Sequence, residues 1–122
     1  MKEISIGHIK YRLTVAERDG QWVAYAERVD AGGRFGVECT GTSAQDALQR
    51  LERWLEWQDE HAAALEALQQ AERAYHRAIA GSAFVGPIEG PSAVEIQKEA
   101  LDALEAARVR LDGVRARQPG VA

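Results

Sequence analysis

The sequence has little cysteine and no long apolar segment, and each shortage excludes a class of protein. Among 122 residues there is one cysteine, Cys39, so an intramolecular disulfide and a cysteine-rich zinc site are excluded. No apolar run approaches the roughly 18 residues that a bilayer-spanning helix needs. Residues 1–15 alternate apolar and charged side chains, which is unlike a secretory signal peptide. These absences predict a cytoplasmic protein that does not associate with membranes.

The sequence also has no excess of basic residues. Its 15 Lys and Arg stand against 19 Asp and Glu, which gives a formal net charge of −4. Nucleic-acid-binding proteins usually carry a basic excess that meets the phosphates, so this composition disfavours nucleic acid as a partner. All of the negative excess lies in residues 42–122, which are also rich in alanine. The length fits one domain.

The first third of the chain carries the pattern of an antiparallel sheet. Residues 9–15 alternate apolar and polar side chains, which is typical of a half-buried strand. Asp19-Gly20 predicts a tight hairpin turn, because both residues tolerate positive φ. Residues 21–27 then form the return strand, Gly32-Gly33 makes a second turn, and residues 34–39 alternate again. We expect a meander of three strands with one buried face.

The rest of the chain predicts two helices. Thr42 or Ser43 can cap the first helix, with Gln45 or Asp46 closing a capping box. No helix breaker occurs before Gly81, so this helix extends to about residue 80. After a loop at about 81–91, a second helix follows. The predicted fold class is α+β: a three-stranded antiparallel sheet packed by a long helix, followed by an antiparallel helical hairpin. The expected parts are a core at 1–60 and a hairpin extension at 61–122.

Apolar stripes predict how the helices pack. One stripe of the first helix is expected to pack on the sheet: Ala44, Leu48, Leu51, Leu55 and Ala62. A second stripe extends to the helix end: Trp54, Trp57, His61, Leu65, Leu68, Tyr75 and Ile79. The last helix offers this stripe a partner face: Ala93, Ile96, Ala100, Leu104, Ala107, Leu111 and Val114. In an antiparallel hairpin, the basic residues Arg108, Arg110, Arg115 and Arg117 fall beside the acidic residues Glu56, Asp59 and Glu60.

Three motifs resemble the HicB-like antitoxin domain family over about residues 8–60. They are YRLTVAE on the first strand, DGQWVAYAE across the hairpin, and GTSAQDALQRL at the helix start. Gly41, Thr42, Ala47 and Leu48 match the family's pattern at the helix start, and Asp46 stands at its acidic position. The resemblance implies a strand-rich core and a role in neutralising a small HicA-type ribonuclease toxin.

The chain departs from that family in two places. Residues 29–33 replace the Pro-Gly-Cys that often precedes the third strand. A long helical hairpin stands where many members have a DNA-binding segment. The resemblance therefore does not carry DNA binding over to this chain.

Candidate catalytic and metal-binding residues are scattered. The HicB-like fold looks like a trimmed ribonuclease H sheet, which raises the question of a metal-dependent nuclease with several converging carboxylates. We interpret Glu17, Asp19, Glu27, Asp30 and Glu38 as solvated charges at the sheet rim, with Glu17 and Glu27 paired across the hairpin. His61 and His76 are too far apart on one helix to share a metal, although Glu72 and His76 form a weak half-site. His8 is expected to precede the first strand. Cys39 has no nearby base, and we interpret it as a small buried side chain. No cofactor and no catalytic activity are expected.

The sequence favours an interaction protein. Val94, Leu101 and Val109 lie off the main stripe of the last helix, and Phe84, Val85 and Ile88 are apolar residues in the loop. We predict a non-catalytic assembly module that forms homo-oligomers, with a dimer favoured. The predicted interface is Trp54, Trp57, His61, Leu65, Leu68, Tyr75, Ile79, Phe84, Val94 and Leu101, and Arg115 and Arg117 could contact phosphate. The alternatives are an antitoxin, a DNA-binding regulator and a metal-dependent nuclease.

Overall fold

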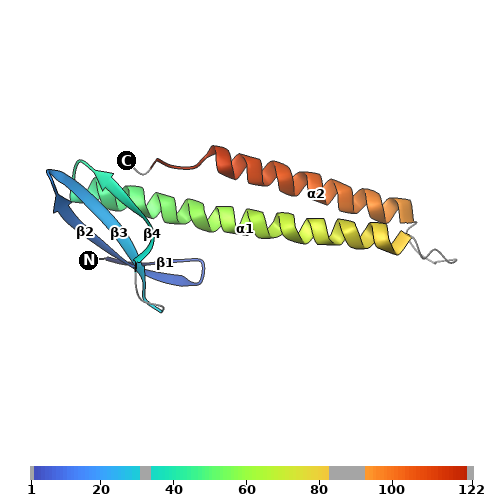
Figure 1. Ribbon diagram of the computed structural model, residues 1–122, viewed down its shortest axis with the longest axis horizontal. Helices are drawn as coiled ribbons and strands as arrows, with labels where there is room; N and C mark the ends of the chain where they lie inside the picture. Colours follow the sequence, from blue (N-terminus) through green and yellow to red (C-terminus); the bar gives the residue numbers. More distant parts are fainter. Residues whose placement is uncertain (1, 31–33, 83–92, 121–122) are drawn as a thin grey trace. The chain divides into compact units, whose positions relative to one another are not determined.

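The computed structural model describes residues 2–30, 34–82 and 93–120 (Figure 1). The chain divides into two compact units. The first comprises Met1–Glu60 together with Arg117–Ala122, and the second comprises His61–Ala116. Gly32, Gly33, Phe84, Val85 and Ile88 lie outside the described residues, so the second predicted turn and the predicted loop contacts lie there too.

The first unit contains a four-stranded antiparallel sheet, so the predicted number of three strands is wrong. The strands are β1 (Lys2–Ile6), β2 (Ile9–Arg18), β3 (Gln21–Arg28) and β4 (Arg34–Gly41), in the order β1-β2-β3-β4. The additional strand, β1, pairs with β2 from Lys2 opposite Leu13 to Ile6 opposite Ile9. It is joined to β2 by a tight turn in which Gly7 has a φ of 61°. His8 therefore lies in a turn between two strands and does not precede the sheet.

The hairpin between β2 and β3 turns at the predicted residues. Asp19 and Gly20 have φ values of 54° and 80°, as a two-residue turn of this kind requires. This turn sets Arg18 opposite Gln21, and Glu17 consequently lies opposite Trp22 and Glu27 opposite Arg12. The predicted pairing of Glu17 with Glu27 is therefore wrong. Because Arg12 and Glu27 are direct neighbours, the register places opposite charges together.

One face of the sheet forms the core of the first unit. Its buried strand residues are Tyr11, Leu13, Ala24, Ala26 and Cys39, and the helix α1 (Ala44–Ser82) adds Ala47, Leu51 and Leu55. These helix residues recur at intervals of four, which is the spacing of one helix face. Ile4, Ile6, Leu48 and Trp54 pack around the cluster. The long helix therefore covers the sheet as expected, and one side of Trp54 is already used for this packing.

Two hydrogen bonds that both involve Asp46 fix the start of α1. The backbone N–H of Asp46 donates to Ser43 Oγ at 3.1 Å, and the N–H of Thr42 donates to Asp46 Oδ2 at 3.0 Å. The capping residue is therefore Ser43, and the Asp46 carboxylate accepts from the residue before the cap, not from Ser43 itself as in a standard capping box. Gly41 approaches this turn so closely that an added Cβ would lie 2.5 Å from the nitrogen of Ala47. The close approach of the Ala47 backbone, in addition to the change of chain direction, explains why glycine occupies position 41.

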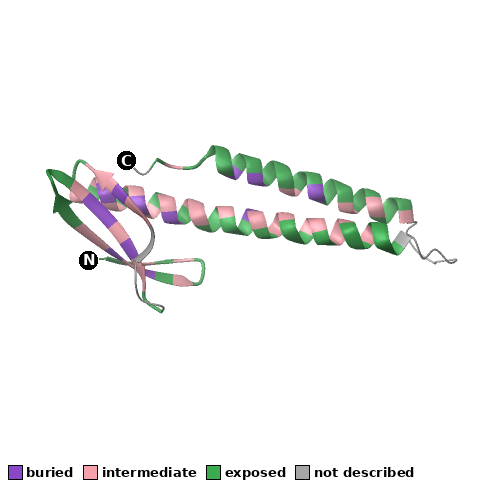
Figure 2. Ribbon diagram, viewed as in Figure 1, coloured by how far each residue is buried: buried purple, intermediate pink, exposed green. Residues whose placement is uncertain are grey.

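The second unit consists of the C-terminal part of α1 and the whole of α2 (Ala93–Ala116). The two helices lie side by side in opposite directions (Figure 1). Ala64 of α1 and Leu104, Leu111 and Val114 of α2 are buried. Figure 2 shows the buried positions of α2 on the side that faces α1. Arg115 Nε donates to His61 Nε2 at 3.5 Å, which places the end of α2 beside residue 61.

Two packing details of the second unit differ from the prediction. Ala62, expected on the stripe that covers the sheet, is exposed, and Ala64 is buried in its place. Ile96, expected to pack in the hairpin, is 44% exposed. The first difference arises because the sheet-covering stripe belongs to the first unit, whereas residue 62 lies beyond that unit.

Candidate functional site

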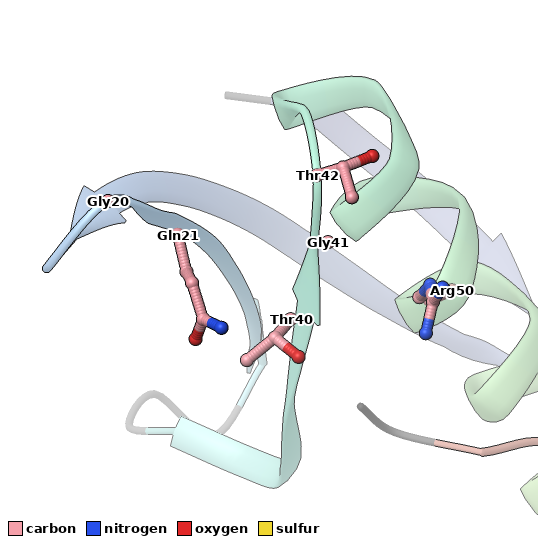
Figure 3. Close-up of a pocket in the computed structure, with 6 residues that line it drawn as sticks. All are labelled: Gly20, Gln21, Thr40, Gly41, Thr42 and Arg50. Carbon is pink, nitrogen blue, oxygen red and sulfur yellow. The ribbon is translucent and has the colours of Figure 1, made fainter.

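A cavity of about 390 Å³ lies where β3, β4 and α1 meet in the first unit (Figure 3). It is lined by Gly20, Gln21, Thr40, Gly41, Thr42 and Arg50. In Figure 3, Gln21 and Thr40 lie on one side of β4 and Arg50 comes from α1 on the other side. Because Gly41 has no side chain, the strand between them presents only backbone. The lining offers hydroxyl, amide and guanidinium groups, which can hold a small polar ligand.

The charge in this cavity is already balanced. Arg50 Nε lies 3.4 Å from Asp46 Oδ2, so the guanidinium faces a carboxylate of its own helix. The N–H of Thr42, followed by the charge of Arg50, lowers the pKa of Asp46 and keeps this carboxylate ionised. None of the six lining residues can act as a general base toward the two threonine hydroxyls, because the guanidinium of Arg50 is already protonated. The cavity therefore shows neither a surplus positive charge for an anion nor a nucleophile with its base.

The carboxylates considered for metal catalysis are distributed around the sheet. Asp30 Oδ2 lies 2.9 Å from Arg28, and Glu38 Oε2 lies 3.3 Å from Arg18. Asp19 is exposed in its turn. Within residues 2–30, 34–82 and 93–120, no three His, Cys, Asp or Glu side chains come together as a metal site would require. The structure thus does not bring these predicted residues together.

His61, His76 and Cys39 have surroundings that indicate no catalytic or metal-binding role. His61 accepts the hydrogen bond from Arg115, and exposed His76 lies beside Tyr75 with ring centroids 6.3 Å apart. Cys39 is fully buried, and burial raises the pKa of its thiol, so the reactive thiolate is disfavoured. This environment agrees with the interpretation of Cys39 as a small core side chain.

The two arginines predicted to contact phosphate have protein partners. Arg115 donates to His61, and Arg117 Nη2 lies 3.5 Å from Glu60 Oε2. The second pair is one of the contacts predicted between the basic end of the last helix and the acidic stretch of the first. Both side chains remain largely accessible, so these weak surface contacts position the arginines without burying them.

The residues predicted to form an interface differ in exposure. Trp54 and Trp57 are half-buried in the first unit, with ring centroids 6.4 Å apart. Within the second unit, His61, Leu65, Leu68 and Tyr75 are half-buried. The exposed members of the prediction are Ile79, Val94 and Leu101, at 44%, 74% and 37%, and Phe84 lies outside the described residues.

One strongly exposed apolar residue is missing from the predicted interface. Val109 is 71% exposed on α2, close to the exposure of Val94. Its distance of 15 residues from Val94 and 8 from Leu101 places all three on one side of the helix, since 3.6 residues make a turn. That spacing was the available signal. The exposed apolar residues of α2 are the candidate functional surface.

Comparisons with protein-family models, with curated proteins and with solved structures found no match. Neither helix in the described part of the chain contains an apolar stretch that could span a bilayer.

Proposed function

We propose that this chain is a non-catalytic, HicB-like assembly module that associates with copies of itself through its helical hairpin. One observation carries the proposal: α2 has apolar side chains on two different faces. Leu104, Leu111 and Val114 are each only 3% exposed, whereas Val94 and Val109 are more than two-thirds exposed. A helix with one partner needs only one apolar stripe. The exposed face is the kind of surface that a second partner covers.

A second copy of the chain is the partner that this surface fits best. Closed symmetric dimers are the commonest oligomers of soluble proteins, and they use the same patch on both subunits. Ile79, near the end of α1, and Ile96, near the start of α2, are each 44% exposed and are further apolar side chains at the end of the hairpin that carries Val94. The dimer is therefore the favoured state, with Val94 and Leu101 as its predicted contact residues.

The resemblance to HicB-like domains supports the assignment of the first unit as the core of the module. The motifs that carry the resemblance fall on β2, on the hairpin to β3 and on the capped start of α1. The unit contains a contiguous core of eight buried side chains. In this proposal the first unit is the folded base and the hairpin provides assembly.

The other predicted functions have their own tests. An antitoxin would bind a purified HicA-type ribonuclease and block its cleavage of RNA. A DNA-binding regulator would shift duplex DNA in a salt-dependent way, and changing Arg115 and Arg117 to alanine would abolish the shift. A metal-dependent nuclease would lose activity on substitution of Asp19 or Asp30.

Light scattering coupled to size-exclusion chromatography tests the proposed function. We expect the full chain to reach twice its monomer mass of 13.4 kDa as its concentration rises. Leu101→Asp should return the mass to that of the monomer, because it places a charge in the apolar contact. Ala103→Asp is the matched control, since Ala103 is exposed on the opposite side of α2. A monomer mass for the full chain at every concentration would overturn the proposal.

A further inference from the structure

The exposed face of α2 carries apolar residues in a symmetric order, with a basic and an acidic residue at the two mirrored positions between them. Five exposed residues follow one another along it at helical spacing, and we call them the outer stripe: Val94, Lys98, Leu101, Glu105 and Val109. At 100° per residue they fall within a sector of roughly 80°. The order is apolar, basic, apolar, acidic, apolar. The apolar ends are alike, and the two charges at mirrored positions are opposite.

The outer stripe is separate from the face that forms the hairpin. The buried side chains Leu104 and Leu111 lie roughly 100° and roughly 120° around the helix from the angular middle of the stripe. Figure 2 shows α2 exposed on the side away from α1. A partner can therefore cover the outer stripe while α2 keeps its contacts with α1.

We infer that two copies of this chain pair through their outer stripes as antiparallel helices related by a twofold axis near Leu101. In this register Val94 lies opposite the second copy's Val109, and Lys98 lies opposite the second copy's Glu105. Leu101 meets its own copy beside the axis. The symmetry produces each contact twice, as a twofold interface does. This inference rests on the proposed function, because it specifies the surface and geometry of the self-association.

The charges select the antiparallel arrangement over the parallel one. In a parallel pair, Lys98 would face Lys98 and Glu105 would face Glu105, and like charges at close range are unfavourable. In the antiparallel pair both positions become Lys–Glu contacts. An exposed ion pair adds little affinity, but it determines orientation when the alternative is repulsive. Lys98 and Glu105 are both exposed, which leaves them accessible to a second copy.

The size of the stripe predicts a reversible dimer. It extends over about 22 Å of helix, at 1.5 Å per residue between positions 94 and 109. Three apolar side chains on such a length cover less than the roughly 800 Å² that each partner contributes to an interface of standard size. We therefore expect a dimer that dissociates on dilution, and an affinity that responds measurably to single charge changes.

Charge exchange on the full chain tests the register. Lys98→Glu and Glu105→Lys should each weaken dimerisation by roughly tenfold, because each converts two attractive contacts into repulsive ones. The double variant Lys98→Glu/Glu105→Lys restores both contacts in the antiparallel register and should recover the original dissociation constant. Glu99→Lys is the matched control for Glu105→Lys, since Glu99 is exposed and lies well away from the stripe. Sedimentation equilibrium measures all five proteins, and circular dichroism checks their helix content.

A cross-link provides a second measurement that does not depend on charge. Leu101→Cys places two thiols beside the axis, and mild oxidation should give a covalent dimer, whereas Ala103→Cys should not. Native Cys39 is buried and does not compete. A full chain that dimerises, but whose affinity is insensitive to the single charge changes or not recovered in the double variant, would overturn this register and leave the proposed function intact. A chain that stays monomeric would overturn both.

Discussion

Replacing Gly41 by alanine tests whether close packing at the junction of β4 and α1 determines that residue. The added Cβ would lie 2.5 Å from the nitrogen and 2.9 Å from the Cα of Ala47, and 2.8 Å from Asp46 Oδ2. Ordinary contacts begin at 3.4 Å, so the first turn of the helix would have to retreat by about 0.9 Å. Overpacking of this kind costs about 1–3 kcal/mol, and a disturbed cap costs about 1 kcal/mol more. We expect Gly41→Ala to lower the free energy of unfolding by about 2–4 kcal/mol.

The same substitution elsewhere in the chain should have the opposite effect. A Cβ on Gly113, inside α2, meets nothing within 4 Å. Alanine is the better helix former, so Gly113→Ala should raise the free energy of unfolding by about 0.5–1 kcal/mol. Urea denaturation at one fixed chain concentration measures both variants. Tryptophan fluorescence reports the first unit, which contains Trp22, Trp54 and Trp57, and circular dichroism reports the helices.

Two results with the Gly41→Ala and Gly113→Ala variants would contradict this explanation of Gly41. A loss below about 1 kcal/mol at Gly41 would mean that the helix start moves without resistance. Glycine would then be explained by some property other than the approach of Ala47. Destabilisation by Gly113→Ala as large as that by Gly41→Ala would likewise contradict the reasoning, because no described atom stands near the added methyl group.

Three further predictions concern residues of the first unit. Leu51→Ala, which removes a fully buried side chain, should cost about 2–5 kcal/mol in urea denaturation, whereas exposed Gln49→Ala should change stability by less than about 0.5 kcal/mol. The N–H of Thr42 and Arg50 lower the pKa of Asp46, so ionised Asp46 stabilises the fold above the ordinary carboxyl pKa, and this contribution disappears as the pH falls through the lowered value. Below about pH 4 the melting temperature of the wild type should therefore fall more steeply than that of Asp46→Asn. Burial raises the pKa of Cys39, so a thiol reagent should modify the native chain at least about a hundredfold more slowly than the urea-unfolded chain.

Features set by neighbouring residues could be predicted from the sequence. The turn at Asp19-Gly20 needs two residues that tolerate positive φ, and both have it. The cap of α1 depends on Ser43, whose Oγ accepts from the N–H of Asp46 three residues on, whereas the Asp46 carboxylate accepts from Thr42 and not from Ser43. The α+β class and the two helices follow from such local signals. The register error at Glu17 and Glu27 was avoidable, because a two-residue turn by itself determines which residues lie opposite each other.

Features set by distant residues were harder to predict. The strand β1 has only two apolar residues, Ile4 and Ile6, and it gains its place by pairing along β2 at the edge of the sheet. The close approach of Gly41 to Ala47 depends on how the helix lies on the sheet, which no local pattern specifies. The exposure of Val109 and Ile96 likewise depends on which face of α2 contacts α1. The spacing of Val94, Leu101 and Val109 could therefore be predicted from the sequence, but how far each side chain is exposed required the structure.

The two units differ in how much core each contains, and this difference gives self-association a measurable consequence for stability. The first unit has a contiguous cluster of eight buried side chains. In the described part of the second unit, the buried apolar residues are Ala64, Leu104, Leu111 and Val114. A hairpin with so little buried area gains proportionally more from a partner that covers the outer stripe.

Because a bound partner stabilises the state that it binds, dilution should lower the melting temperature of the second unit more than that of the first. Thermal melts at a series of chain concentrations, followed by circular dichroism and by tryptophan fluorescence, measure the two responses. Melting temperatures that do not change with concentration in either signal would show that association contributes nothing to the hairpin.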